Sequence, residues 1–332
     1  MTAPLNLLTD IAGLAVGHAT DLVLGSGVTA ILFDRPAVAA LHLGGGAPGG
    51  RDTDLLHPAA TVQAVDAIVL SGGSTFGLDA AGGVQAMLRE AGRGQIFGGR
   101  AVPLAPQAIL FDLANGGNKD WGRFSPYRDL GYAAACAARP GAFALGSVGA
   151  GTGATTATVK GGLGSASATA STGHRVAALV AVNAVGSPLI GEGPHFWAAP
   201  FEEGDEFGGL GWPARITAAD RALRVKGGRG TATTIGLVVT DAVLAKPQVN
   251  RLARMADDGL ARAIFPAHAP NDGDTLFAAA TGEKEGGNLT EIGHLAALVL
   301  ARAIGRAVYE ATALPWAGAQ PAWKDRFSAR RQ

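Results

Sequence analysis

A short segment at the start of an apolar run contains three threonines, Thr231, Thr233 and Thr234, one of which could serve as a nucleophile. Residues 230–236 read GTATTIG, and a Lys- and Gly-rich loop beginning at Lys226 leads into them. Threonine is common in strands, so the pattern alone predicts the start of a strand. A nucleophilic threonine needs a base, and a threonine at a chain end carries one, because a free α-amine has a pKa of about 7.7 to 8.0. This chemistry requires that the chain be cut just before the threonine.

Two carboxylates, Asp272 and Asp274, follow about forty residues later in the segment NDGDT at residues 271–275. Asp-Gly is a turn signal, so the structural interpretation is a polar turn that leads into a strand. In an extended chain, residues two apart point the same way, which would bring the two carboxylates together. Such a pair would orient an ammonium group, and each carboxylate would shift the pKa of the other.

Spacing excludes several other chemistries. The seven histidines form no HExxH pair, and one cysteine cannot build a multi-Cys zinc site. Neither a GxxxxGK[ST] loop nor a GxGxxG fingerprint between a strand and a helix occurs. Residues 71–77 (SGGSTFG) are similar to a nucleophile elbow, but Phe76 stands where that motif needs glycine. We therefore expect no metal and no cofactor.

Composition and charge exclude two classes of partner. Lys plus Arg is 27 and Asp plus Glu is 27, and no long run of either sign offers a site for nucleic acid or an anionic membrane. No uncharged apolar run approaches the roughly 18 residues of a membrane helix, and the N-terminus lacks the charged region of a secretory signal. The single Cys136 allows no disulfide within the chain. We expect a cytoplasmic protein.

Short apolar runs and helical spacing predict a mixed α and β fold in one domain. Strands are expected at residues 27–33, 64–70, 142–148, 176–182, 234–239 and 276–280. Helices are expected over residues 77–91, 247–264 and from about Thr290, the last with Thr290 as its N-cap. Residues 191–213 contain no clear element and are expected to form a surface excursion. No repeat or linker divides the chain, so we predict a single domain over residues 1–332.

Glycine and apolar residues are abundant. The chain has 50 glycines, and 48% of its residues are hydrophobic against 16% charged. These glycines lie inside and beside apolar segments, which predicts tight turns and close backbone approaches within one packed body. The excess of apolar residues fits a large core or an interface between subunits.

Seven segments, in this order along the chain, resemble the nylon-oligomer hydrolase and β-aminopeptidase family, which includes L-aminopeptidase/D-esterase enzymes. They are GAPGGRDTD at 46–54, LSGGSTFGLD at 70–79, AILFDL at 108–113, GAGTG at 149–153, KGGLG at 160–164, AVNAVG at 181–186 and DGDT at 272–275. Each motif is short, and their colinear order carries the resemblance.

The resemblance implies an α/β (α+β) protein with an αββα sandwich that cleaves itself. The cut would fall between Ala232 and Thr233, giving an α-subunit of residues 1–232 and a β-subunit of residues 233–332. Thr233 would then attack an amide carbonyl and form an ester, which water releases. The family usually assembles as tetramers or larger, so we expect a homo-oligomer, a tetramer of cleaved units, whose partner is a small amide or peptide substrate.

The resemblance also assigns roles to other residues. Asn183 matches the asparagine that stabilises the oxyanion, and Lys160 resembles a lysine near the nucleophile. Asp272 and Asp274 align with the acidic pair of the nylon-oligomer hydrolases, whereas the aminopeptidase branch has a pair that looks like Ser and Glu. The chain departs from these relatives at Ala232, where they carry Asn or Gly. An N-to-O acyl shift needs mainly the hydroxyl of the next residue, so alanine before the cut is compatible with it. The alanine is, however, expected to affect the rate of self-cleavage.

Three functions follow from these assignments. The first is a self-processing amidohydrolase that acts on short amides with a free amino end, such as aminohexanoate oligomers, β-amino peptides or amino acid amides. The second is an acyltransferase of the ornithine-acetyltransferase type, in which an amine instead of water takes the acyl group. The third is an uncut, non-catalytic relative that serves as a binding protein.

Overall fold

The computed structural model describes residues 4–227 and 232–327, so residues 230 and 231 of the predicted nucleophile segment lie outside it. The strands are β1 (Leu14–Asp21), β2 (Ser26–Leu43), β3 (Gly50–Arg51), β4 (Ala64–Ser71), β5 (Gln95–Phe97), β6 (Arg100–Val102), β7 (Gln107–Ile109), β8 (Gly162–Thr169), β9 (Arg175–Asn183), β10 (Thr233–Ala242) and β11 (Thr275–Lys284). The helices are α1 (Ala80–Glu90), α2 (Tyr127–Ala137), α3 (Lys246–Ala263), α4 (Leu289–Tyr309) and α5 (Trp323–Phe327), with 3-10 turns at Leu8–Asp10, Asp54–Leu56, Ser74–Asp79, Gly149–Gly151 and Ala199–Phe201.

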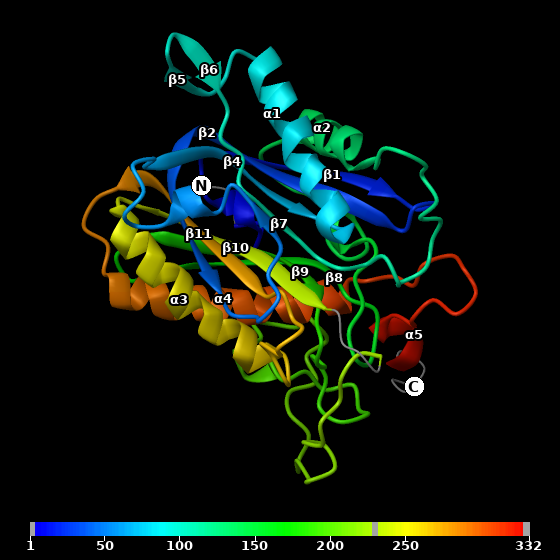
Figure 1. Cartoon of the computed structure of the whole chain (residues 1–332). Coiled ribbons are helices and arrows are strands. Elements are labelled where there is room, and N and C mark those ends of the chain that lie inside the picture. The colour runs from blue at the N-terminus through cyan, green and yellow to red at the C-terminus, as the bar shows by residue number, and fades with distance from the viewer. Residues whose placement is uncertain (1–3, 228–231, 328–332) are drawn as a thin grey trace.

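The long strand β2 connects two layers of sheet. Its first half pairs with β1 and β4, and its second half pairs with β11, with a register shift between Leu32 and Ala37. The strand order is β3-β7-β4-β2-β11-β10-β9-β8, with β1 beside β2. Helices α1 and α2 cover one layer and α3 and α4 cover the other (Figure 1). The predicted mixed fold, an αββα sandwich, is confirmed.

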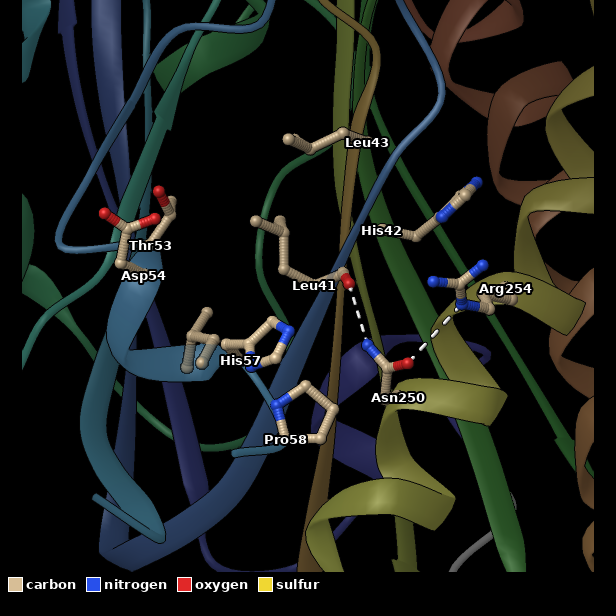
Figure 2. A pocket seen from close by; sticks show the side chains of 10 residues that line it. Leu41, His42, Leu43, Thr53, Asp54, His57, Pro58, Asn250 and Arg254 are labelled. Carbon is tan, nitrogen blue, oxygen red and sulfur yellow. Dashed lines mark hydrogen bonds between the residues drawn. The ribbon is translucent and has the colours of Figure 1, made fainter. Parts of the chain in front are cut away.

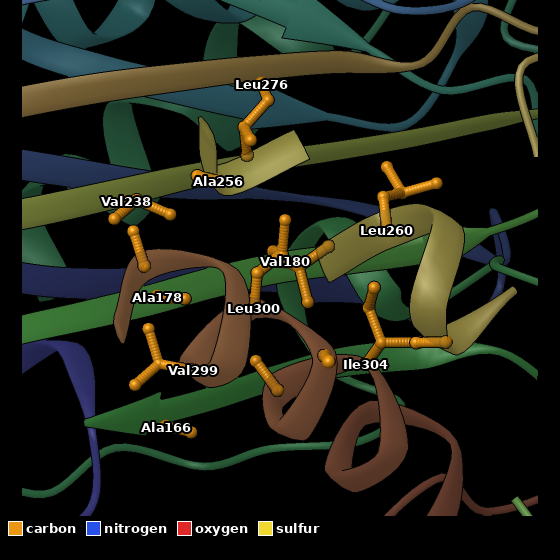
Figure 3. Close-up of a cluster of buried hydrophobic side chains, with 14 of the residues drawn as sticks. Ala166, Ala178, Val180, Val238, Ala256, Leu260, Leu276, Val299, Leu300 and Ile304 are labelled. Carbon is orange, nitrogen blue, oxygen red and sulfur yellow. The ribbon is translucent and has the colours of Figure 1, made fainter. Parts of the chain in front are cut away.

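Strand alternation divides the core into layers. In β9, Leu179 and its odd-numbered neighbours pack between the two sheets, whereas Val180 and the even-numbered residues face α3 and α4. Figure 3 shows Leu260 of α3 and Leu300 and Ile304 of α4 beside Val180. The same alternation holds in β10, so an odd-numbered residue at the start of that strand faces the space between the sheets.

Most of the expected elements are present, with two corrections. The strand expected at 142–148 is wrong: Gly141 and Gly146 adopt left-handed φ values of 87° and 85°, which break an extended run, and Gly146 forms only an isolated bridge to Leu163. The N-cap of α4 is Asn288, not Thr290, because the Asn288 side chain accepts hydrogen bonds from the backbone N–H groups of Thr290 and Glu291.

The segment 191–213 was expected to lie on the surface, and this holds only in part. Its loops project from the α3–α4 side of the sandwich (Figure 1). However, Phe196 and Phe207 are 3% and 1% exposed and join the core beside α4. Helix α4 is itself long and apolar enough to cross a membrane, but 72% of its most apolar window is buried in the protein, as expected for a core helix.

Glycine in β8 lets α4 approach the sheet, which leads to a stability prediction. A Cβ added at Gly164 would lie 2.0 Å from the Ala303 carbonyl oxygen of α4. We expect Gly164→Ala to lower the free energy of unfolding by about 1–3 kcal/mol, the usual cost of overpacking, measured by urea denaturation. Gly193→Ala is the matched control, because the nearest atom to its added Cβ is 3.5 Å away. Equal stability of the two variants would contradict this account.

Candidate active site

Three segments meet at one edge of the second sheet: the end of β9 and the starts of β10 and β11. Thr233 pairs directly with Asn183 in the antiparallel β9–β10 ladder, so both side chains point to the same face, between the sheets. Strand β11 runs parallel to β10, and Ala232 forms a parallel bridge to Asp272 just before it. Four of the residues predicted from the sequence, Thr233, Asn183, Asp272 and Asp274, therefore lie together.

The predicted scissile peptide bond lies in a defined set of contacts. Thr233 is 4% exposed, and its Oγ1 donates to the Ala232 carbonyl oxygen at 2.5 Å. The same oxygen accepts from the backbone N–H of Gly273 at 3.0 Å. A Cβ at Gly273 would lie 2.7 Å from Thr233 Oγ1, so only glycine leaves room for the hydroxyl. The threonine hydroxyl is thus held on the carbonyl it would attack, and a donor is already directed at the oxygen that would gain charge.

The two carboxyl groups of the acidic pair have different surroundings. Asp274 Oδ1 accepts from the Thr234 N–H at 2.7 Å, and its Oδ2 accepts from His268 Nδ1 at 2.9 Å and from the His268 N–H at 3.2 Å. Asp272 Oδ1 is buried and has no hydrogen-bond partner among the described residues. Burial, followed by the adjacent charge of Asp274, raises the pKa of Asp272 to about 8. Burial and the neighbouring charge thus favour the protonated form of Asp272 at neutral pH.

Asn183 is anchored by four hydrogen bonds. Its Oδ1 accepts from Lys226 Nζ at 2.6 Å, from the Thr155 N–H at 3.0 Å and from Asn115 Nδ2 at 3.1 Å. Its Nδ2 donates to the Phe111 carbonyl oxygen at 2.8 Å. These partners fix which end of the amide carries the N–H groups, and one N–H of Nδ2 is left to serve as an oxyanion donor.

Lys160 is buried behind the loop that holds Asn183. Its buried ammonium uses its three donors on carbonyl oxygens, those of Gly151, Ala154 and Gly161, at 2.7–3.1 Å. Burial lowers its pKa to about 7. Because Ala154 precedes the residue whose N–H holds Asn183 Oδ1, Lys160 braces the loop behind Asn183 in this uncut chain.

Sequence reasoning assigned no role to several residues that build this site. Lys226 carries the 2.6 Å contact to Asn183, and burial lowers its pKa to about 7 against the attraction of Asp112 and Asp272. Its position seven residues before the predicted cut was the available signal. His268 gave no signal, because its partner Asp274 was recognised only as one half of the acidic pair.

Two cavities of similar size lie near this edge. One, of about 560 Å³, is lined by Asn115, Thr155 and Lys226, the residues that hold Asn183 Oδ1. The other, of about 540 Å³, lies between the end of β2 and α3; Figure 2 shows His42 and Asn250 in its wall. The first is the candidate substrate cavity, because its lining contacts a predicted catalytic residue. The described residues contain no group of three His, Cys, Asp or Glu able to hold a metal.

A prediction follows for Asn183. We expect Asn183→Ala to lower kcat by about 10²–10³, the loss typical of removing one oxyanion donor, with a smaller change in KM. The measurement is steady-state hydrolysis of a chromogenic amino acid amide by the purified protein. Asn250→Ala, an asparagine in the wall of the other cavity, is the control and should stay within about twofold of the parent. An Asn183→Ala variant with unchanged kcat would remove that residue from the mechanism.

The sequence of the chain matches that of known amide hydrolases. The sequence model of peptidase family S58 matches residues 6–320. An uncharacterized aminopeptidase of Mycobacterium leprae is 41% identical over 340 residues, 94% of this chain and 92% of the relative. A 6-aminohexanoate-oligomer endohydrolase of a Kocuria species is 29% identical over 286 residues, 82% of this chain and 74% of the relative.

Solved structures share the fold. The β-aminopeptidase of a Burkholderia species matches with a TM-score of 0.73 and 22% identity, over all of this chain and 95% of that one. The L-aminopeptidase D-Ala-esterase/amidase of Ochrobactrum anthropi, described as a variant of the Ntn hydrolase fold, has a TM-score of 0.73 and 21% identity, over 100% and 94%. Together with the family match and the relatives, these findings confirm the resemblance stated above: the chain belongs to peptidase family S58, and its chemistry is amide-bond hydrolysis.

Proposed function

We propose that the chain cuts itself between Ala232 and Thr233 and that the freed Thr233 is the nucleophile of an amidohydrolase. The observation that carries this proposal is the pair of contacts on the Ala232 carbonyl oxygen: the Thr233 hydroxyl at 2.5 Å and the Gly273 N–H at 3.0 Å. A nucleophile and an oxyanion donor on the same carbonyl group are what an N-to-O acyl shift requires.

The self-cleavage uses one proton donor. Thr233 Oγ1 attacks the Ala232 carbonyl carbon, and the oxygen becomes an oxyanion held by the Gly273 N–H. The bond from that carbon to the Thr233 nitrogen then breaks, and Asp272 gives its proton to the leaving nitrogen. The proton lost by the hydroxyl returns to Asp272, so the shift is balanced. Water then hydrolyses the ester, which leaves a carboxylate on Ala232 and a free α-amine on Thr233.

The mature enzyme repeats this chemistry on a substrate. The α-amine of Thr233 takes the hydroxyl proton while Oγ1 attacks the substrate amide, and that proton goes to the leaving amine. Asn183, fixed by Lys226 and Thr155, supplies an N–H to the oxyanion. Water then attacks the acyl ester on Thr233 and releases the acid.

The expected substrates are short oligoamides or peptides with a free amino end. Relatives named as 6-aminohexanoate-oligomer endohydrolases and aminopeptidases support this class. We also propose that the cleaved units form a homotetramer in the cytoplasm, with a mass of about four chains by light scattering.

A denaturing gel with intact-mass analysis tests the cut. From 33.3 kDa and the residue share 100/332, a small fragment of about 10 kDa and a large one of about 23 kDa are expected. N-terminal sequencing of the small fragment should begin Thr-Thr-Ile. A single band that persists on long incubation would favour an uncut binding protein. Turnover that amine acceptors raise, while hydrolysis stays slow, would favour acyl transfer.

A further inference from the structure

A chain of polar contacts runs from the start of β10 to helix α3. The Thr234 N–H donates to Asp274, and Asp274 in turn accepts from His268 Nδ1 at 2.9 Å. His268 Nε2 lies 3.1 Å from Asp257 Oδ2 on α3. His42 Nε2, in the wall of the cavity in Figure 2, lies 3.5 Å from the same oxygen. The residue that follows the nucleophile is therefore linked to α3 through one imidazole ring.

The two ring nitrogens of His268 both face carboxylate oxygens. The Nδ1 contact to Asp274 is a hydrogen bond, whereas Nε2 meets Asp257 at ion-pair distance without hydrogen-bond geometry. A doubly protonated ring, which carries a positive charge, suits both neighbours. The titratable and charged groups around the ring are Asp257 from α3, His42 from β2, and Asp272 and Asp274 from the segment before β11. Asp257, followed by Asp274, raises the pKa of His268 to about 10, against the opposing effect of burial.

The backbone is shaped to hold this ring. A Cβ at Gly44 would lie 2.5 Å from His268 Cε1, so the glycine backbone packs directly against the imidazole. The Gly44 N–H donates to the Asp274 carbonyl oxygen at 3.0 Å, and His268 itself has a left-handed φ of 57°. Non-glycine residues rarely adopt this conformation, and here it lets both the N–H and the ring of His268 reach one carboxylate.

We propose that His268 is a positioning residue: its ring, held between Asp257 and Asp274, keeps the Asp274 carboxyl group on the Thr234 N–H and thereby leaves the role of proton donor to Asp272. The ring does not touch the scissile carbonyl; it acts through Asp274. The inference rests on the proposed function, in which Asp272 protonates the leaving Thr233 nitrogen during self-cleavage. Without the His268 ring, Asp274 would lose the contact that holds its carboxylate on the Thr234 N–H, and the two carboxyl groups would become interchangeable as carriers of the proton.

The first experiment measures the protonation of the His268 ring and does not depend on enzyme activity. In the uncut Thr233→Ala protein, NMR of the histidine ring nitrogens followed from pH 5 to 10 should show His268 protonated beyond pH 9. Adding Asp257→Asn should lower the His268 midpoint by at least one pH unit. A His268 that titrates near 6.5, the ordinary value, would overturn the proposal.

The second experiment measures self-cleavage against pH in otherwise wild-type protein. We expect His268→Gln to slow cleavage at pH 7 by at least tenfold and to move the whole profile to higher pH, because both carboxyl groups lose a neighbouring cation. A ring with only a structural role would lower the rate at every pH and leave the profile where it was. Circular dichroism confirms folding, and His294→Gln, an exposed histidine on α4, is the matched control.

The outcomes separate this inference from the proposed function. A Thr233→Ala protein that is still cut would remove the proposed nucleophile, whatever His268 does. An unshifted profile in His268→Gln, with Thr233→Ala uncut, would remove the positioning role and leave the nucleophile in place.

Discussion

Replacing Thr233 with alanine should give a folded, full-length chain of about 33 kDa that neither cuts itself nor hydrolyses amides. The variant lacks the hydroxyl that lies 2.5 Å from the Ala232 carbonyl oxygen, and without the cut no α-amine is formed at residue 233. Loss of a nucleophile typically costs about 10⁴–10⁶ in kcat, so the residual rate should be near the limit of detection. Intact-mass analysis and amide turnover, measured after a week at 25 °C, check both halves of the prediction.

Two variants control for damage to the fold. Thr233→Ser keeps a hydroxyl at the same place and should still be cut into fragments of the same sizes. Thr281→Ala removes a threonine from the far end of β11 and should leave both cleavage and turnover within about twofold. If Thr233→Ala retained full turnover, another residue would have to be the nucleophile; if Thr281→Ala also stayed uncut, the effect would report folding.

Sequence patterns predicted those parts of the fold that depend on local chemistry. The β-branched runs at 176–182 and 234–239 became β9 and β10, because strands buried on both faces consist of apolar residues throughout. Strand β8 was missed, since its sequence GLGSASAT is small and polar. It forms because Gly162 and Gly164 let α4 lie directly on the sheet, a contact between segments about 140 residues apart.

In the candidate site, too, residues marked by local sequence were predicted, and residues that depend on distant contacts were not. Thr233, Asp272 and Asp274 were selected because their segments precede predicted strands and match the resembling family in order and spacing; the structure then showed that these strands are parallel neighbours. Lys226 and His268 were not selected. The only signal for Lys226 was its closeness to the predicted cut, because its partner Asn183 lies 43 residues away in the chain, and His268 stands in a loop whose path the sequence does not specify. Lys160 was selected by resemblance, and in the uncut chain its ammonium is enclosed by carbonyl oxygens.

Asp272→Asn should separate the catalytic proton from the shape of the side chain. Asparagine is similar in size but cannot transfer a proton to the leaving Thr233 nitrogen. Loss of a positioned general acid costs about 10²–10⁴ in rate, so self-cleavage at pH 7 should slow by that factor. The wild-type rate should fall above pH 8, because the raised pKa of Asp272, about 8, means that the proton is present below that pH and lost above it. The slow residual rate of the variant should show no such fall.

Asp272→Asn, which should slow self-cleavage, should make the uncut protein more stable at alkaline pH. In the Thr233→Ala background, Asp272 is protonated when folded up to about pH 8 but ionised when unfolded above about pH 3.9. The folded state therefore binds more protons between these values, and the Asp272 protein loses stability as the pH rises from 4 to 8. Asparagine does not titrate and so removes that loss. The urea midpoint of Asp272→Asn, compared with that of the Thr233→Ala parent at the same pH, should therefore be more favourable at pH 8 than at pH 4.

Asp274→Asn is the matched control for both measurements. Its carboxylate accepts hydrogen bonds from Thr234 and His268, so removing its charge should lower stability at neutral pH. The carboxyl groups of Asp272 and Asp274, separated only by Gly273, are thus expected to give stability changes of opposite sign when each is replaced by its amide. Stability changes of the same sign would mean that the proton is shared between the two carboxyl groups. Asp272 would then not be distinguished from Asp274 as the acid that protonates the Thr233 nitrogen.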